Sequence, residues 1–177
     1  DALAQMIKKD GCQMRTGFVG TPYILHVLSD YGHTDLAYTL LCRKEYPSWL
    51  YAVGKGATTI WEHWDGIMEN GEFWSTDMNS FNHYAYGSVA DWIYEQAAGI
   101  QTVEEHPGFE VARIQPKPGN QLKWLGASIE TRHGKISSRW IHTDGAIRYE
   151  IVTPVPAQIV IGEKEYKVEP GKYVFWG

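Results

Sequence analysis

Hydrophobic positions in the first hundred residues recur with helical spacing. Three apolar stripes stand out, at Leu3–Ile7, Tyr23–Leu28 and Leu36–Leu41, each with the three- and four-residue steps of one helix face. Residues that are typical of helix N-termini and C-termini lie at the ends of these stripes and complete the prediction. The expected helices span residues 1–9, 21–31, 34–44, 47–53 and 82–98.

Four residues are expected to mark the limits of these helices. Thr21 and Pro22 should form the N-cap and first residue of the second helix, Thr34 should open the third and Pro47 the fourth. A few helices rich in aromatic residues make a poor closed bundle, so we expect them to be part of a larger helical structure.

The pattern changes to alternation near residue 100. Apolar and polar residues alternate in 136–141, 146–152 and 159–161, and glycine turns follow His133, Asp144 and Pro170, which predicts short antiparallel strands in a small sandwich. Residues 99–108 read as a linker. The sequence therefore predicts an α + β fold, with helices in 1–100 and a β-sandwich in 101–177.

Composition excludes several classes of protein. The chain has 177 residues, 44% of them hydrophobic, and a net charge of −5, which argues against disorder and against binding to a nucleic-acid backbone. No apolar run is long enough to span a bilayer, and the first ten residues are no signal peptide, so any export signal would lie outside this chain. Cys12 and Cys42 are too few for a disulfide framework or structural zinc, although one bridge stays open.

Aromatic residues single out one segment as chemically interesting. Half of the 24 aromatic residues fall between Tyr46 and Tyr94, where they suit a core or a surface that stacks on sugar rings. Within this region Glu62 lies between Trp61 and Trp64. Tryptophan side chains exclude water from a neighbouring carboxylate, and such an environment suits a carboxylate that acts in acid–base catalysis. The alternative is a helix-start carboxylate bonded to backbone amides. His63 is interpreted as structural.

Two further segments are candidates for binding. His83 lies between Asn82 and Tyr84 at the start of a predicted helix, where it either contacts a ligand or caps the helix. Residues 15–22 hold two glycines before a helix start, but their spacing is wrong for a phosphate loop. No serine-hydrolase elbow or zinc motif occurs, which leaves carboxylate chemistry, without a metal or cofactor.

Three segments together resemble a known family. Residues 15–22 (RTGFVGTP), 56–66 (GATTIWEHWDG) and 80–89 (SFNHYAYGSV) are similar, in this order, to the C-terminal portion of bacterial α-L-rhamnosidases of glycoside hydrolase family 78. The resemblance extends over essentially the whole chain. It implies the last helices of a six-hairpin (α/α) toroid, followed by a C-terminal β-sandwich.

The resemblance also implies a site. This family removes terminal α-L-rhamnose with inversion, and its general base corresponds to Glu62, its sugar-contacting histidine to His83. Trp61, Trp64 and Asp65 would shape the site. The family's general acid lies upstream of this chain's segments, so the chain is expected to be an inactive fragment that lacks half of the catalytic pair.

The implied partners are rhamnose-containing glycans or glycosides and the upstream toroid helices. Without those helices the stripe of Leu3, Met6 and Ile7 should be exposed, together with parts of the stripes at Tyr23–Leu28 and Leu36–Leu41. Self-association of the fragment is therefore expected.

Two alternatives remain open. One is another glycosidase of the same toroid fold, because a toroid and a glutamate do not fix the sugar. The other is a carbohydrate-binding or assembly module whose sandwich binds glycan. Trp124, Trp140 and Trp176 are the tryptophans of the sandwich, and their alternating positions predict that all three are core residues, which makes the binding module the weaker alternative.

Overall fold

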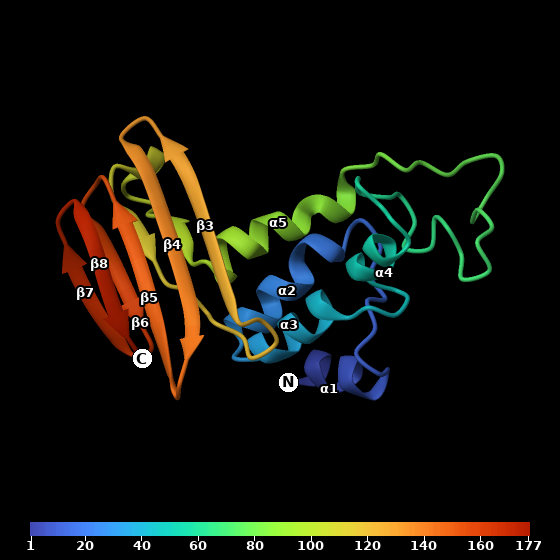
Figure 1. Ribbon diagram of the computed structural model, residues 1–177, viewed down its shortest axis with the longest axis horizontal. Helices are drawn as coiled ribbons and strands as arrows, with labels where there is room; N and C mark the ends of the chain where they lie inside the picture. The colour runs from blue at the N-terminus through green and yellow to red at the C-terminus, as the bar shows by residue number, and fades with distance from the viewer. The chain divides into compact units, whose positions relative to one another are not determined.

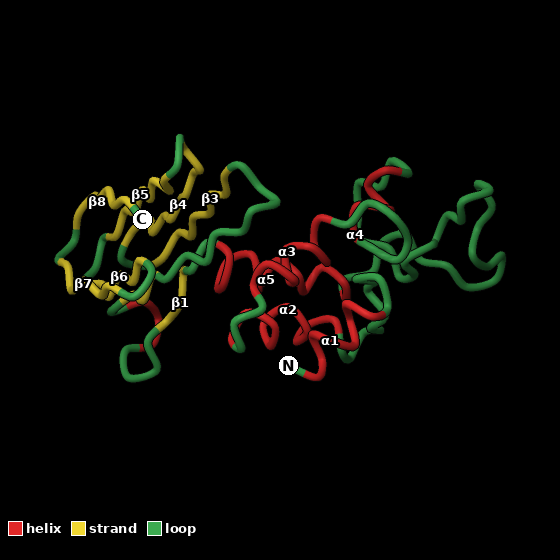
Figure 2. Tube along the Cα trace, turned by 90° about the horizontal axis from the view of Figure 1, so that it is seen from below, coloured by secondary structure: helices red, strands yellow, loops and turns green.

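The computed structural model describes residues 1–177, which form two compact units, Asp1–Asp91 and Trp92–Gly177. Helices dominate the first unit, and the strands lie in the second (Figure 1, Figure 2). The division falls inside a short helix, α5 (Val89–Trp92). The domain limits at residue 100 stay a prediction. None of the helices has the length and apolar character needed to cross a membrane.

The helical unit is built around two packed helices. Its helices are α1 (Ala2–Lys9), α2 (Thr21–Asp30), α3 (Thr34–Cys42) and α4 (Trp49–Gly54). Leu25 and Leu28 of α2 are buried, as are Leu36 and Leu40 of α3. The expectation that parts of the stripe at Leu36–Leu41 are uncovered is therefore wrong for Leu36 and Leu40, because packing of α2 against α3 buries them within the unit. In the first stripe Met6 is exposed as expected, whereas Ile7 is buried.

The predicted helices begin at slightly different residues from those expected. Gly20, and not Thr21, precedes α2, and the Thr21 hydroxyl instead donates to the Gly17 carbonyl at 2.8 Å. Ser48, and not Pro47, caps α4 by accepting the Tyr51 amide hydrogen at 3.1 Å. A serine hydroxyl satisfies a first-turn amide, which proline cannot do.

The helix predicted over 82–98 is a composite. It starts three residues late with the 3₁₀ turn η1 (Ala85–Ser88), continues as α5 and ends in the π-helical turn η2 (Ile93–Ala97). The His83 imidazole takes the first amide, since Nδ1 accepts the hydrogen of Ala85 N at 3.3 Å. The Ala98 amide bonds to the Ile93 carbonyl, five residues back, at 2.8 Å, the spacing of a π turn.

The second unit holds two four-stranded sheets, as the predicted sandwich requires. One has the order β1-β2-β6-β7 and the other β3-β4-β5-β8. All neighbouring strands are antiparallel except β2 and β6. Their bounds are β1 (Ile100–Thr102), β2 (Ala112–Ile114), β3 (Trp124–Thr131), β4 (Gly134–Thr143), β5 (Ala146–Thr153), β6 (Ala157–Ile161), β7 (Lys164–Val168) and β8 (Gly171–Trp176), with a short 3₁₀ turn η3 (Pro107–Phe109).

The interpretation of 99–108 as a linker is wrong at its start. Ile100 begins β1, is buried and pairs with Ile114 of β2. Gly99 approaches the backbone so closely that a Cβ there would lie 2.1 Å from the Gln115 carbonyl carbon. The segment 99–108, which its polar residues indicated to be a linker, thus contributes a strand to the sheet.

Only one of the three sandwich tryptophans is a core residue. Trp140 is fully buried, and its indole Nε1 donates to the Ala97 carbonyl at 2.9 Å. Trp124 and Trp176 are 57% and 61% exposed, so the prediction that they are core is wrong. Trp124 pairs with Ile141, the neighbour of Trp140 along β4, and adjacent strand residues point to opposite faces.

Candidate active site

The candidate site occupies residues 55–84, which contain no helix and no named strand (Figure 2). Two of the sequence motifs meet there as short antiparallel segments. The His83 amide bonds to the Ile60 carbonyl at 2.8 Å, and the Glu62 amide to the Ser80 carbonyl at 2.9 Å. The Thr59 hydroxyl donates to the Phe81 carbonyl. These bonds bring Glu62 and His83, 21 positions apart in the sequence, onto neighbouring stretches of backbone.

The Glu62 carboxylate is held from one side. Its Oε2 accepts the amide hydrogen of Ser80 at 3.0 Å, and the side chain is half-buried. The alternative interpretation of Glu62 was a carboxylate at the start of a helix that bonds to backbone amides. The bond to the Ser80 amide agrees with it, but the position at a helix start is wrong, because Glu62 lies in a loop. A carboxylate anchored through one oxygen presents the other in a defined direction.

The His83 ring is oriented by a bond and by stacking. Because Nδ1 accepts from Ala85 N, the neutral ring carries its hydrogen on Nε2. Phe18 stacks on the ring with centroids 4.7 Å apart and planes 12° apart, and Tyr84 stacks at 5.6 Å. His83 does cap the turn, as one sequence interpretation expected, and the same bond fixes its tautomer.

Phe18 is a site residue that sequence reasoning missed. It belongs to the loop 15–22, so this third motif also reaches the site. The sequence did contain a signal for Phe18, namely a large aromatic residue in a short segment bounded by glycines, Gly17-Phe18-Val19-Gly20. That pattern indicates an exposed aromatic, but it does not say which ring the aromatic contacts.

The two tryptophans that flank Glu62 have different surroundings. Trp61 is only 5% exposed and packs edge-on against Phe81, with ring centroids 5.2 Å apart. Trp64 is half-buried, stacks on Tyr86 at 3.8 Å and donates from Nε1 to the Thr16 carbonyl at 3.2 Å. Trp61 therefore supports the loop from behind, whereas Trp64 joins it to residues 15–22.

His63 lies beside Glu62 in the sequence but has a separate partner. Its ring stacks on Trp74 with centroids 3.7 Å apart and planes 17° apart. This contact holds the 63–66 turn against the distal part of the loop, in line with a structural role.

Asp65 is half-buried among tyrosines. Burial is the main cause that raises the pKa of Tyr46, Tyr51 and Tyr86, and the Asp65 carboxylate raises each of these pKa values further. The three hydroxyls therefore stay protonated at neutral pH and can donate hydrogen bonds. Tyr51 uses its hydroxyl to bond the Ile67 carbonyl at 2.9 Å.

The cavity that adjoins the loop is small. A cavity of about 70 Å³ behind the loop is bounded by Trp49, Ile60 and Trp61, well below the few hundred Å³ typical of small-molecule sites. A larger groove of about 610 Å³ runs along α1, where Met6 and Ile7 face Ile24. This groove is mainly apolar and lacks the candidate catalytic residues.

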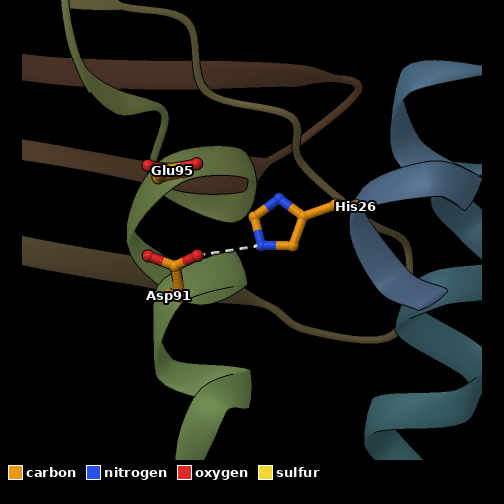
Figure 3. A group of neighbouring side chains, drawn as sticks. All are labelled: His26, Asp91 and Glu95. Atoms are coloured by element: carbon orange, nitrogen blue, oxygen red, sulfur yellow. Dashed lines mark ion pairs between the residues drawn. The ribbon is translucent and has the colours of Figure 1, made fainter. Parts of the chain in front are cut away.

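An ion pair outside the loop was not expected from the sequence. His26 Nε2 of α2 lies 3.3 Å from the Asp91 carboxylate of α5, and Glu95 follows Asp91 four residues later (Figure 3). Asp91 is well exposed, whereas the His26 side chain is mostly buried, and an ion pair that water reaches on one side contributes little to stability. Cys12 and Cys42 are free thiols, so the disulfide left open by the sequence is not formed.

A carboxylate anchored in an aromatic loop, on a helical unit followed by a β-sandwich, is an arrangement that a glycoside hydrolase can use, but a fold alone does not fix a function. Matches to family models define the class. Residues 1–97 match the bacterial α-L-rhamnosidase six-hairpin glycosidase domain, and residues 99–173 match the bacterial α-L-rhamnosidase C-terminal domain. The chain belongs to the bacterial α-L-rhamnosidase family.

Individual relatives are much longer than this chain. An α-L-rhamnosidase of Streptomyces avermitilis is 45% identical over 145 residues, which are 82% of this chain and 14% of the relative. One from Formosa agariphila is 38% identical over 152 residues, or 86% of this chain and 16% of the relative. The chain thus spans about one sixth of these curated relatives.

Solved structures of the same enzymes have the same fold. The Streptomyces avermitilis α-L-rhamnosidase complexed with L-rhamnose matches with a TM-score of 0.89 at 35% identity, covering 98% of this chain and 19% of that one. The Aspergillus terreus enzyme matches with a TM-score of 0.92 at 34% identity, covering 98% and 20%. The predicted fold class is confirmed, with the last toroid helices followed by the C-terminal sandwich.

Proposed function

We propose that this chain is the C-terminal part of an inverting α-L-rhamnosidase and carries its general base, Glu62. The observation that carries the proposal is the anchoring of the Glu62 carboxylate by the Ser80 amide, in the loop that also holds His83. The named activity of the relatives supports rhamnoside hydrolysis as the reaction.

Glu62 would act on water. With Oε2 engaged by Ser80, the other oxygen, Oε1, accepts a proton from a water molecule as that water attacks the anomeric carbon. Inverting glycosidases hold their two carboxyl groups about 6.5–9.5 Å apart, which leaves room for this water. A single fixed oxygen suits this task, because the direction of attack sets the stereochemistry of the product.

His83 would bind the sugar. Its Nε2–H is the free donor of the neutral ring, since Nδ1 is engaged by Ala85, and it would donate to a sugar hydroxyl. Trp64 and Asp65 would shape the pocket from the Tyr86 side, where Asp65 offers a hydrogen-bond acceptor among tyrosine donors. Trp61 would contribute as the buried support of Glu62.

The general acid is expected in the upstream part of the toroid, as in the family that the sequence resembles. Without it, Glu62 can position water but cannot protonate the leaving oxygen, a step worth about 10²- to 10⁴-fold in rate. We also propose that the toroid part of this chain is incomplete and extends over residues 1–100. The chain alone would be inactive, and the intact parent would hydrolyse rhamnose-containing glycans or glycosides.

The test compares this chain with its intact parent on an aryl α-L-rhamnoside. The parent should release rhamnose, first detected by NMR as the β anomer, and the 177-residue chain should show no turnover above background. First appearance of the α anomer would contradict inversion. Turnover by the chain within about tenfold of the parent would mean that a carboxylate such as Glu69 or Asp77 supplies the acid.

We further propose that the groove along α1 is covered by upstream helices in the parent and by a second copy in the isolated chain. Met6 lines this groove and is exposed, and Tyr23 and Val27 of α2, outside the groove lining, are further exposed apolar residues. Such surfaces favour association. Light scattering over a dilution series should show dimers that Met6→Lys weakens. A strictly monomeric chain at all concentrations would contradict this part of the proposal.

A further inference from the structure

The outer face of the sheet β3-β4-β5-β8 carries a row of aromatic and basic side chains. Register places Trp124 of β3 opposite Ile141 of β4, Ile141 opposite Arg148 of β5, and Arg148 opposite Trp176 of β8. Directly paired residues share one face of a sheet, so the register places these four side chains in a single row. The row crosses all four strands of the sheet β3-β4-β5-β8, whose backbone is drawn in Figure 1. The two tryptophans stand at its two ends.

Both tryptophans are exposed although neighbouring core positions are buried. Each exposes more than half of its surface, whereas Trp140 on the inner face exposes none. Large exposed apolar side chains arranged in a row on a soluble domain mark a binding surface more often than isolated ones do. Ile141 and Val174, on the same face, extend the apolar surface between them.

The Trp124 ring is held in place. The Arg139 guanidinium lies over it, 5.4 Å from the ring centroid, a cation–π contact. Gly126, opposite Arg139 on β3, makes room for this arrangement, because a Cβ at Gly126 would lie 3.3 Å from Arg139 Cγ. The indole is therefore fixed before any ligand arrives, which lowers the entropy cost of binding.

The face also carries a surplus of positive charge. Arg139 pairs with Glu150 at 3.5 Å, and Arg148 pairs with the same carboxylate. Two guanidinium groups thus share one carboxylate, and Lys172, opposite Val152 on the same face, adds a further cation. This surplus occurs in a chain whose net charge is −5, so it is a local feature of the face.

We propose that this face binds an acidic polysaccharide, one that carries carboxylate groups on its sugar rings. The two indoles would stack on the apolar faces of sugar rings, and Arg139, Arg148 and Lys172 would pair with uronate groups between them. Three strand steps separate β3 from β8, which puts the tryptophans about 14 Å apart, a span that requires a chain of several sugars. Charge complementarity selects an acidic chain over a neutral one.

The binding surface is independent of the catalytic proposal. All its residues belong to the unit Trp92–Gly177, and none of them takes part in the chemistry assigned to Glu62. Failure of either proposal therefore leaves the other unchanged.

The test is native affinity electrophoresis of the 177-residue chain in gels that contain polygalacturonate. Fully methyl-esterified polygalacturonate, which has the same backbone without the charge, is the matched polymer. The acidic polymer should retard the chain, and Trp124→Ala and Trp176→Ala should each weaken binding about tenfold. Arg148→Gln should weaken binding too, and added salt should reduce it.

Two variants serve as matched controls. Tyr31→Ala removes an exposed aromatic from the helical unit, and Lys164→Gln removes one cation from β7, in the other sheet. Both should bind as the unchanged chain does, and unchanged circular dichroism would confirm that every variant is folded.

Four results would overturn the proposal. No retardation by polygalacturonate, or equal loss in the control variants, would show that the face is not the binding surface. Equal retardation by the esterified polymer would refute the assignment to an acidic glycan. Binding by the chain but not by the intact parent would mean that another domain covers this face.

Discussion

The loop 55–84 and the β-sandwich hold their important side chains by different means. In the loop, one hydrogen bond from the Ser80 amide holds Glu62, and one hydrogen bond from the Ala85 amide together with stacking on Phe18 holds His83. In the sandwich, the side chains follow from ladders of paired strands, in which β3, β4 and β5 pair over most of their lengths. Loss of one ladder bond leaves many others in place, whereas each loop side chain has only a few contacts, so the loss of one of them removes a large share of what holds it.

Because of this difference, we expect activity to depend mainly on the loop and stability mainly on the sandwich. Loops on a rigid scaffold commonly carry catalytic groups, since they can present side chains without satisfying the repeat of a helix or strand. The loop compensates for its missing ladder with aromatic stacks, of which Trp64 on Tyr86 and His63 on Trp74 are the closest. Substitutions in the loop should therefore change activity first, and those in the sandwich should change stability first.

The largest effect should come from Glu62→Gln in the intact parent. Glutamine keeps the shape and can still accept the Ser80 amide hydrogen, but it cannot take a proton from water, so kcat should fall by about 10²- to 10⁴-fold with KM little changed. Glu72→Gln, an exposed change in the same loop, is the control and should retain full activity. Near-normal kcat in the Glu62 variant would remove Glu62 from the mechanism.

In the sandwich, Trp140→Ala should be the most destabilising of the tryptophan substitutions. It empties a fully buried site and removes the bond to the Ala97 carbonyl, so the free energy of unfolding should fall by about 3–5 kcal/mol. The exposed Trp124→Ala should cost about 1 kcal/mol or less. Urea denaturation of the two variants measures this difference, and equal losses would contradict the assignment of opposite faces.

The sequence predicted those parts of the fold that depend on local patterns. Alternation along 136–141 correctly placed a strand, and the apolar stripe of Tyr23–Leu28 correctly placed a helix. It could not predict which face Trp124 occupies, because alternation within one strand does not set the register with the next. The strand at Ile100 was missed because three residues are too short to show a period.

Prediction of the site met the same limit. The motif around Glu62 and the motif around His83 were recognised separately, and their antiparallel pairing joins positions far apart in the sequence. The stacking of Phe18 on His83 spans 65 positions, and no local pattern encodes such a contact. The residue types indicated which chemistry the site could perform, whereas the relative positions of the side chains could be known only from the three-dimensional structure.

Two glycines offer a sharper test of how the sandwich tolerates change. Gly99 and Gly145 both have positive φ, of 76° and 81°. A Cβ at Gly99 would collide with the Gln115 backbone, whereas one at Gly145 would meet nothing within 4 Å. Gly99→Ala should therefore destabilise the chain by more than about 3 kcal/mol, and Gly145→Ala by about 1–2 kcal/mol.

Thermal or urea unfolding of the two alanine variants makes this comparison directly. Because the two positions have nearly the same φ, the difference measures mainly the close approach at Gly99. Similar losses in the two variants would mean that backbone conformation alone accounts for both glycines.

A smaller effect is expected where the loop orients the sugar contact. In the parent, His83→Ala should raise KM about tenfold by removing the donor, with a lesser effect on kcat. Phe18→Leu should raise KM about threefold, since it removes the stack but leaves the donor, and Phe18→Tyr should restore the normal value. An unchanged KM for His83→Ala would exclude His83 as a sugar contact.

The smallest effect concerns a tyrosine of the sandwich core at high pH. Burial raises the pKa of Tyr149, so the folded state keeps this proton at a pH where the unfolded state, with a pKa of about 10, has lost it. Below about pH 10 both states are protonated and Tyr149 does not affect the pH dependence of stability. As the pH rises above that value, the unfolded state binds fewer protons, and stability falls by at most about 1.4 kcal/mol per pH unit for this one group.

Tyr149→Phe should reduce the slope of unfolding free energy against pH between about pH 10 and pH 11 without changing the slope near neutrality. An identical slope in the variant would mean that the other buried tyrosines, such as Tyr38 and Tyr86, whose pKa values are also raised by burial, account for all of the alkaline loss of stability.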